Sequence, residues 1–291
     1  MIVHLISDRR RLVPGATDFG SERACLVAQV RHAVEAGVDA VQVRERDLEA
    51  RALADLVAEL VGLAQGSGTR ILVNDRVDVA LASGAGGVHL RADSMAPAVV
   101  RTIAPPGFII GRSVHSLAEA VAVSGADYLI AGTVWPTPSK SGAVPLLGIA
   151  GFAAIARTAR IPTLGVGGMT IGRASEVAAA AGAGVAAIGL FLGAESQGCR
   201  AVSLERVSEV KEQGVAFLRR GRRRLHGPLE PLDRLHLLPA VPHDAPAERG
   251  GRKATMGSAR RLLKRRQGFI VAPGLVQRDA ALKCLDSRRI T

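Results

Sequence analysis

The chain has 291 residues, of which 48% are apolar and 3% aromatic, and it carries a formal net charge of +12. This apolar content is ample for a buried core, whereas no apolar stretch reaches the roughly 18 residues that a membrane span needs. The N-terminus leads directly into an apolar run followed by Asp8 and three arginines. We see no signal peptide in this pattern and expect a cytoplasmic protein that does not act at a membrane.

The positive charge is concentrated in the last third of the chain. Residues 1–194 hold 17 Lys and Arg against 16 Asp and Glu, whereas residues 195–291 hold 21 against 10. We therefore expect a folded domain over residues 1–219 and a basic, Arg-rich tail over residues 220–291, which this composition predicts to be solvated and disordered. Two alternative explanations of the tail remain: it contacts RNA or DNA, or it is the product of a change of reading frame. The tail lacks the interleaved aromatic residues of a known module, so we do not expect nucleic acid as a partner.

Short apolar runs, each closing on glycine or a small polar cluster, recur through the first 193 residues. They occupy residues 2–6, 40–43, 71–73, 87–90, 108–110, 128–131, 163–166 and 185–188. Continuous apolar strands are typical of a parallel sheet that is covered on both faces. Eight of them alternating with helices predict an α/β fold, the (β/α)8 TIM barrel, in which the chemistry lies at the carboxyl ends of the strands.

The segments between these runs have apolar residues at helical spacing. They predict helices over residues 21–36, 48–63, 116–123, 149–157 and 173–181, several of them ending at a glycine, and a closing helix over residues 201–218. The three cysteines, Cys25, Cys199 and Cys284, show no short pair spacing. We expect neither a disulfide framework nor a zinc site.

The end of the second predicted strand carries Gln42, Arg44 and Arg46 at every second position. In extended backbone such residues point the same way, so an amide and two guanidinium groups face one volume. Guanidinium forks suit phosphate oxygens, and an amide suits a ring nitrogen with its exocyclic amine. The alternative is a salt-bridged barrel mouth, in which Arg44 or Arg46 pairs with Asp75 or Glu45.

Four later strand ends complete the candidate site. Asp75 follows the third strand next to Asn74, and a carboxylate beside an amide suits Mg²⁺, which takes one or two protein oxygens plus substrate phosphate. Residues 132–142 form a loop stiffened by two prolines that displays hydroxyl groups and an ammonium group, which indicates anion binding. The glycines that end strands seven and eight offer backbone N–H groups as a phosphate cradle.

In combination and order, these motifs resemble the family of thiamine phosphate synthase and its relative thiazole tautomerase. The resemblance covers residues 2 to about 193. It rests on Gln-x-Arg at Gln42 and Arg44, the Asn74-Asp75 pair, Gly-Val-His-Leu at residues 87–90, Gly-x-Ser at Gly111 and Ser113, Pro-Thr-x-Ser-Lys at residues 136–140, and Gly167-Gly168.

The resemblance implies a transferase of thiamine biosynthesis. It would join 4-amino-2-methyl-5-hydroxymethylpyrimidine pyrophosphate to a thiazole phosphate and release pyrophosphate. The pyrophosphate would leave first, giving a pyrimidine cation that the thiazole nitrogen captures, so the enzyme's task is electrostatic and positional. The expected partners are these small molecules. The sequence does not decide whether the protein forms a homo-oligomer.

The family's site residues are carried over to matching positions. Gln42 and Ser113 would contact the pyrimidine, while Arg44, Asn74 and Lys140 would bind the pyrophosphate, and Arg44, Lys140 and Ser113 are the residues we expect to be catalytic. The thiazole phosphate would lie against Thr137, Ser139, Gly168, Ile188 and Gly189, and Asp75 would ligate Mg²⁺.

Some positions depart from the synthase pattern. Arg46 stands where the synthases usually have lysine, which keeps the charge but changes a point donor into a fork. Ser94 stands where they usually have a second Mg²⁺-binding aspartate, and Asp93 could substitute only if the loop shifts, since adjacent side chains point apart. Gly189 replaces a common serine.

Other stretches resemble the tautomerase branch, including residues 44–46, 111–116 and 167–170. The tautomerases place a histidine just after the glycine of strand six, where this chain has Thr133, which cannot act as a base near neutral pH. His115 is the nearest alternative, although a lone histidine after a strand is more often structural. A thiazole tautomerase and a non-catalytic barrel that binds thiazole phosphate and carries an interaction tail are therefore the alternatives to a synthase.

Overall fold

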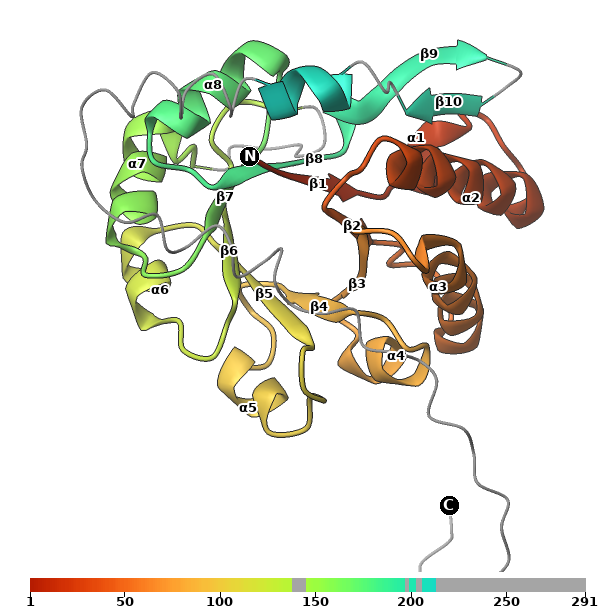
Figure 1. Ribbon diagram of the computed structural model, residues 1–291, viewed down its shortest axis with the longest axis horizontal. Helices are drawn as coiled ribbons and strands as arrows, with labels where there is room; N and C mark the ends of the chain where they lie inside the picture. The colour runs from red at the N-terminus through yellow and green to blue at the C-terminus, as the bar shows by residue number, and fades with distance from the viewer. Residues whose placement is uncertain (138–144, 197–198, 203–205, 213–291) are drawn as a thin grey trace, which may run out of the picture. The chain divides into compact units, whose positions relative to one another are not determined.

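Eight parallel strands close into a barrel in the computed structural model, and helices surround them (Figure 1). The structure describes residues 1–137, 145–196, 199–202 and 206–212. Each strand pairs with its neighbours in chain order, and β8 pairs with β1. The strands are β1 (Ile2–Ile6), β2 (Ala40–Val43), β3 (Arg70–Asn74), β4 (Gly87–Leu90), β5 (Ile109–Val114), β6 (Tyr128–Ala131), β7 (Thr163–Val166) and β8 (Gly184–Ala187).

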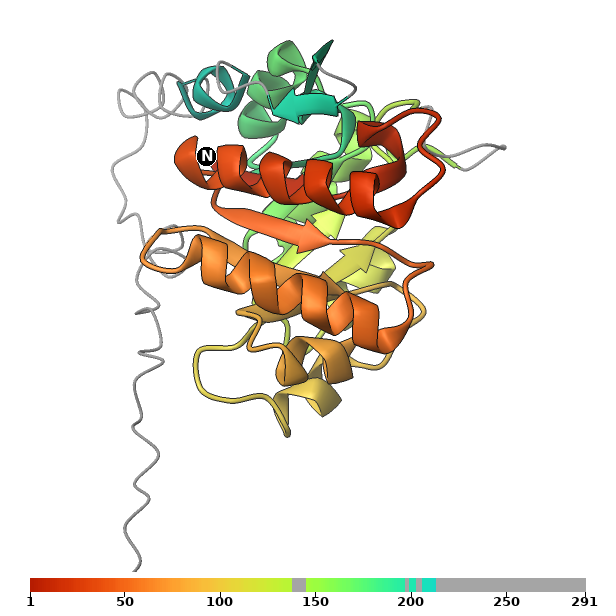
Figure 2. The ribbon, with the colours of Figure 1, turned by 90° about the vertical axis from the view of Figure 1, so that its right-hand side faces the viewer.

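Helices connect successive strands on the outside of the barrel. Figure 2 shows the two longest, α2 and α3, packed side by side. The helices are α1 (Arg9–Leu12), α2 (Phe19–Glu35), α3 (Ala50–Ala64), α4 (Val77–Ala82), α5 (Pro97–Arg101), α6 (Leu117–Ala122), α7 (Gly148–Thr158) and α8 (Ile171–Ala179), with a 3-10 turn, η1, at Gly189–Phe191. Of the helices in the described ranges, none is long and apolar enough to cross a membrane.

Local sequence sets where several helices begin. Asp18 accepts a hydrogen bond from the Ser21 N–H (2.8 Å) ahead of α2, and Ser116 and Thr170 cap α6 and α8 in the same way. Such caps satisfy backbone donors that have no partner inside the helix. These three caps fix where α2, α6 and α8 begin after the ends of β1, β5 and β7, which is the side of the barrel where the candidate site lies.

The strands alternate between two apolar cores. Val3, Leu5 and Val41 belong to the outer core between the sheet and the helices, whereas Ile2, Ile6 and Ala40 point into the barrel with Leu72, Ile109, Ile130, Leu164 and Ala186. This alternation is the pleat of each strand. It also turns a set of polar residues inward near the carboxyl ends of the strands.

The predicted barrel is confirmed, with strand ends that agree to within one residue except at β5, which continues to Val114. The closing helix predicted over residues 201–218 is wrong at its start. Residues 201 and 202 belong to an antiparallel hairpin of β9 (Leu192–Ser196) and β10 (Cys199–Val202), and helix is described only over residues 206–212. The helix was predicted from the spacing of valines along one segment. The hairpin depends instead on backbone hydrogen bonds between two segments, which that spacing does not indicate. The short helices α1, α4 and α5 were not predicted, and the basic tail over residues 220–291 lies outside the described residues.

Candidate active site

Polar side chains line the inside of the barrel near the carboxyl ends of its strands. Gln42 on β2 is buried, and its amide nitrogen donates to Asn74 Oδ1 at the end of β3 (2.8 Å). On its other side, Gln42 Oε1 lies 3.2 Å from Nε2 of the buried His4 on β1. Burial lowers the pKa of His4 to about 4, so the ring is neutral at pH 7. With Oε1 as the acceptor, His4 Nε2 is the donor, and the three side chains form one hydrogen-bonded row.

A second buried row crosses β4, β5 and β6. His89 Nδ1 lies 3.0 Å from the Tyr128 hydroxyl, and His89 Nε2 lies 2.9 Å from Ser113 Oγ. Burial lowers the pKa of His89 well below its ordinary value, so this ring is also neutral. Gly111 makes room for the row, because a Cβ there would lie 2.2 Å from Tyr128 Cζ and 2.5 Å from His89 Nδ1. The Gly-x-Ser motif therefore places Ser113 against a histidine.

Arg44 follows β2 beyond Gln42 and is half-buried. Burial lowers its pKa, and the positive charges of Arg46 and Arg91 lower it further, although Asp8 and Glu45 act in the opposite direction. Its backbone N–H donates to Ser7 Oγ (2.9 Å), but its guanidinium forms no hydrogen bond or ion pair with the residues that the structure describes. A partly desolvated cation among like charges favours an anionic ligand.

Glu45 contacts a different arginine, Arg9, on the side of the strand ends that faces α2. Arg9 is buried, and its guanidinium binds Glu45 (2.9 Å), Glu22 on α2 (2.6 Å) and Asp47. The hydrogen bonds from Arg9 lower the pKa of Asp47 to about 2. Burial raises the pKa of Glu45, against the opposing hydrogen bonds from Ser7 and Arg9. The alternative of a salt-bridged mouth is thus wrong for Glu45, whose ion pair is with Arg9.

Asp75 adopts a φ of 65°, a left-handed conformation that aspartate tolerates, and its N–H donates to the His89 carbonyl (2.9 Å). The Ser94 hydroxyl donates to Asp75 Oδ1, and Arg91 Nη1 lies 3.8 Å from Asp75 Oδ2. Asp93 pairs instead with Arg91, and its side chain is 69% exposed. The structure therefore places Ser94, and not Asp93, against Asp75.

The carboxylates near Asp75 limit how the Mg²⁺ implied by the family resemblance could be held. Among the described residues, no three or more His, Cys, Asp or Glu side chains are grouped so as to hold a metal. Asp75 offers one partly exposed carboxylate, while the carboxylate of Asp93 is engaged by Arg91. Mg²⁺ is often held by one or two carboxylates plus substrate phosphates. The residues fit the one-carboxylate arrangement and do not fit a site with two.

Arg112 lies at a predicted strand end but received no role from the sequence, and the structure shows that it fixes the loop that carries Ser94. Its guanidinium donates to the carbonyl oxygens of Ala92 (2.7 Å), Ser94 (3.1 Å) and Met95 (2.9 Å). Arg91 likewise received no role from the sequence, because a lone arginine after a strand has no motif around it. His4, His89 and Tyr128 were also given no role from the sequence. Each is a polar residue on the inward face of an otherwise apolar strand, and that pattern is the signal that would have identified them.

The ends of β6 and β7 approach each other closely. Gly167 and Gly168 both have positive φ, and Cβ atoms there would lie 2.4 Å from Thr133 Cγ2 and 2.6 Å from the Pro136 carbonyl. Arg173 donates to the Gly168 carbonyl and stacks over the Trp135 ring at 5.0 Å. The turn after β7 is thereby fixed beside the segment that leads to Thr137. Ser139 and Lys140 lie outside the described residues.

Ile188 and Gly189 follow β8, next to β1 in the barrel. A Cβ at Gly189 would lie 3.4 Å from Nη2 of Arg11, which comes from α1. The site residues predicted from the sequence that the structure describes therefore lie on the strand ends or in the loops that follow them. The role of each in binding stays a prediction.

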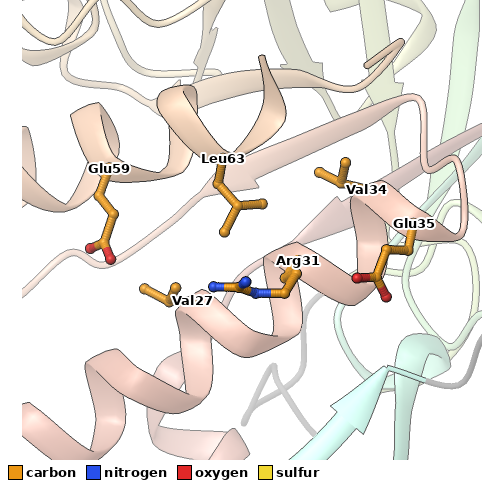
Figure 3. Close-up of a pocket in the computed structure, with 6 residues that line it drawn as sticks. All are labelled: Val27, Arg31, Val34, Glu35, Glu59 and Leu63. Carbon is orange, nitrogen blue, oxygen red and sulfur yellow. The ribbon is translucent and has the colours of Figure 1, made fainter. Parts of the chain in front are cut away.

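A separate surface hollow lies between α2 and α3 (Figure 3). Its volume is about 490 Å³, and it is lined by Val27, Arg31, Val34, Glu35, Glu59 and Leu63. These residues come from the two helices and from no strand end. The hollow brings together none of the groups predicted to act on a substrate.

Comparison with known proteins points to one family. Residues 13–191 match the sequence model of the family described as thiamine monophosphate synthase. The thiamine-phosphate synthase of Roseiflexus castenholzii is 40% identical over 195 residues, which is 66% of this chain and 82% of that protein. A putative thiamine-phosphate synthase of Geobacter sulfurreducens is 40% identical over 192 residues, 65% of this chain and 86% of that one. The solved structure of thiamine phosphate pyrophosphorylase from Pyrococcus furiosus is 33% identical, with a TM-score of 0.61, and the match covers 75% of this chain and 96% of that chain.

Proposed function

Because this chain belongs to the thiamine monophosphate synthase family, we propose that its barrel joins the pyrimidine pyrophosphate to a thiazole phosphate and releases pyrophosphate. It is a transferase of thiamine biosynthesis. We assign the reacting centre from the environment of Arg44. It is a half-buried guanidinium at a strand end, near two other arginines and without a partner among the described side chains.

The departing pyrophosphate requires positive charge that is already in place. Arg44, Arg46 and Arg91 lie close enough for the latter two to lower the pKa of Arg44. Neutralising a leaving group with fixed cations lowers the barrier without reorganisation during the reaction. Arg44 binds the pyrophosphate, helped by Asn74 and by Lys140 from the loop after β6.

The pyrimidine is held by the rows of neutral side chains inside the barrel. Gln42 has one amide hydrogen left after its bond to Asn74, and it contacts the polar edge of the ring. Ser113 contacts the pyrimidine while His89 fixes its hydroxyl. Because both histidines are neutral, the interior adds no charge that would repel a developing pyrimidine cation.

Asp75 would hold Mg²⁺ together with oxygens of the substrate pyrophosphate. Such an ion neutralises developing negative charge on a leaving phosphate group. Ser94 fixes the Asp75 carboxylate through Oδ1. Arg91 places a guanidinium near the other oxygen, so the carboxylate is not left unpaired when no metal is present.

The thiazole phosphate lies at the ends of β7 and β8, where barrels of this type commonly bind phosphate. Backbone N–H groups of Gly168, Ile188 and Gly189 cradle it, with the hydroxyl groups of Thr137 and Ser139. Fixing the thiazole ring facing the pyrimidine provides the proximity that the bond-forming step needs.

The tautomerase alternative has less support. Thr133 is buried and has no basic nitrogen. His115, the other candidate base, has Nδ1 bound to the Gly132 carbonyl (2.5 Å), and its backbone N–H binds Glu119, which is how a structural histidine behaves.

The protein acts on small-molecule substrates in the cytoplasm, and its oligomeric state is measured in the same experiment as its activity.

The test is thiamine phosphate formation by the purified full-length protein from both substrates. We would run the reaction with Mg²⁺, with EDTA and with each substrate omitted, oxidise the product to fluorescent thiochrome, and measure the mass of the protein by light scattering. Product that requires both substrates and depends on Mg²⁺ supports the proposal. No product from a folded protein would contradict it and favour a tautomerase or a barrel that only binds thiazole phosphate.

A further inference from the structure

Three consecutive arginines follow β1, and the structure gives each a different environment. Arg9 is buried among Glu22, Glu45 and Asp47. Arg10 points to solvent, with 68% of its side chain exposed, and pairs with Asp47. Arg11 is partly buried and forms no hydrogen bond through its side chain and no ion pair within the part of the chain that the structure describes.

The guanidinium of Arg11 lies against Gly189, at the end of β8. A Cβ on Gly189 would be 3.4 Å from Arg11 Nη2 and 3.9 Å from Nη1, and it would meet no other atom within 4 Å outside its immediate chain neighbours. The strands β1 and β8 are neighbours in register, with Leu5 opposite Ala187, so both segments start at the same rim of the barrel.

Gly189 does not need to be glycine for its backbone, since its φ is not positive. Its missing side chain instead leaves open space directly beside a cation that has no described partner. This space is on the strand end where the thiazole phosphate is expected to lie, because phosphates in such barrels bind after strands seven and eight. A guanidinium fork matches two phosphate oxygens at once.

We propose that Arg11 binds the phosphate group of the thiazole substrate from the β1 side of the barrel, through the gap that Gly189 leaves. The inference rests on the proposed function, since it places a further residue in the same phosphate site. Arg11 is thus a specificity residue for a phosphorylated acceptor. It acts separately from Arg44, which serves the pyrophosphate of the other substrate.

The experiment compares Arg11→Ala and Arg11→Lys with Arg10→Ala, a matched control one residue away in the same short helix. Steady-state kinetics give KM for each substrate, and circular dichroism and thermal melting confirm folding. We expect Arg11→Ala to raise KM for thiazole phosphate about 10- to 100-fold, the usual effect of losing hydrogen bonds to a charged group. KM for the pyrimidine pyrophosphate should change less than about twofold, since Arg11 does not reach that substrate. Arg11→Lys should recover part of the loss, because it restores charge without the fork.

A binding measurement separates this inference from the proposed function. Calorimetry with the thiazole phosphate and with the corresponding thiazole alcohol should show that Arg11→Ala weakens binding of the phosphate alone. If the wild-type protein forms thiamine phosphate but Arg11→Ala leaves KM and binding of thiazole phosphate unchanged, only the role of Arg11 is overturned. That role is also overturned if Arg10→Ala has an equal effect. If the folded wild-type protein neither turns over nor binds thiazole phosphate, the proposed function and this inference both fail.

Discussion

Arg9 and Arg44 follow neighbouring strands of the barrel, and their environments are opposite. Arg9 lies on the side that faces α2 and is surrounded by three carboxylates. Arg44 lies beyond the inward-facing Gln42, with two arginines near it and no described partner for its guanidinium. The residue between these two environments, Glu45, pairs with Arg9 and not with Arg44.

This difference separates structural charge from functional charge. A cation that is neutralised within the protein contributes to the fold and is not available to a ligand. A cation that burial and like charges disfavour, and that forms no ion pair within the protein, is available to an anionic ligand. The two arginines should therefore respond differently to removal, one in stability and the other in turnover.

The largest expected effect is the loss of Arg9. Replacement by Met (Arg9→Met) leaves Glu45 buried without its cation, and breaking a buried pair on one side costs about 3–5 kcal/mol of unfolding free energy. Urea denaturation would measure it, with Arg10→Ala as the control, because the exposed Arg10 pair should contribute no more than about 1 kcal/mol. Equal stability of Arg9→Met and the wild type would show that the carboxylate cluster tolerates its own charge.

Arg44→Met should have the opposite profile. We expect kcat/KM to fall by about 10²- to 10³-fold, the typical effect of removing one donor that stabilises charge in the transition state. The unfolding free energy should stay the same or rise slightly, because repulsion from Arg46 and Arg91 disappears. Arg51→Met, on α3, controls for the loss of an exposed arginine. A destabilised but fully active Arg44→Met would reverse the comparison between the two arginines.

The neutral interior predicts a specific acid sensitivity. The ordinary pKa of histidine is 6.5, and the folded-state pKa of His4 is lowered to about 4. The unfolded chain therefore binds a proton between these values that the folded protein does not, and stability is lost as the pH falls from 6.5 towards 4. The shift corresponds to about 3 kcal/mol. His89 contributes with the same sign.

Unfolding free energies measured in urea between pH 7 and pH 4 test this. His4→Gln should reduce the pH-dependent loss by about 3 kcal/mol relative to the wild type, even if the variant is less stable at pH 7. His32→Gln, on α2, is the control. An identical pH slope in His4→Gln and the wild type would mean that the interior is not the source of the acid sensitivity.

The barrel could be predicted from the sequence because its strands are covered on both faces. Continuous apolar runs marked β1, β2, β4, β6 and β7 to the residue. At β5 the prediction stopped at residue 110, since Arg112 and Ser113 look like a loop although their polar groups are satisfied inside the sheet and at the loop after β4. The hairpin of β9 and β10 was missed because its stability depends on pairing between segments and not on a pattern within either one.

The site was predictable where residue chemistry depends on position along a strand. Gln42, Asn74 and Ser113 lie inside the barrel because they alternate with buried apolar residues. The partners could not be predicted, because they come from distant parts of the chain. These contacts depend on how the strand ends meet in space. They are the contacts of Glu45 with Arg9, of Arg91 with Asp75, and of Arg11 with Gly189.

The smallest expected effect concerns Asp75. Here the distinction between a paired arginine and an unpaired one is weakest, because Arg91 lies near the Asp75 carboxylate and also near Arg44. Ser94→Asp adds a second carboxylate where a hydroxyl now contacts Asp75. A carboxylate about 4 Å from a doubly charged ion is worth about 2 kcal/mol in an exposed site, so the Mg²⁺ concentration for half-maximal activity should fall about 30-fold. Calorimetric titration with Mg²⁺ in the presence of pyrophosphate gives the same quantity without turnover.

Asp93→Ser is the matched control for that variant, because Asp93 is exposed and paired with Arg91. It removes a carboxylate from the same loop without altering the contact between Ser94 and Asp75, so it should leave the metal titration nearly unchanged. If Ser94→Asp does not shift the titration, this loop does not face the metal. If Asp93→Ser weakens Mg²⁺ binding more than Ser94→Asp strengthens it, the metal lies on the Asp93 side of Arg91, and Asp93 takes the role that we assign to the oxygen of Asp75.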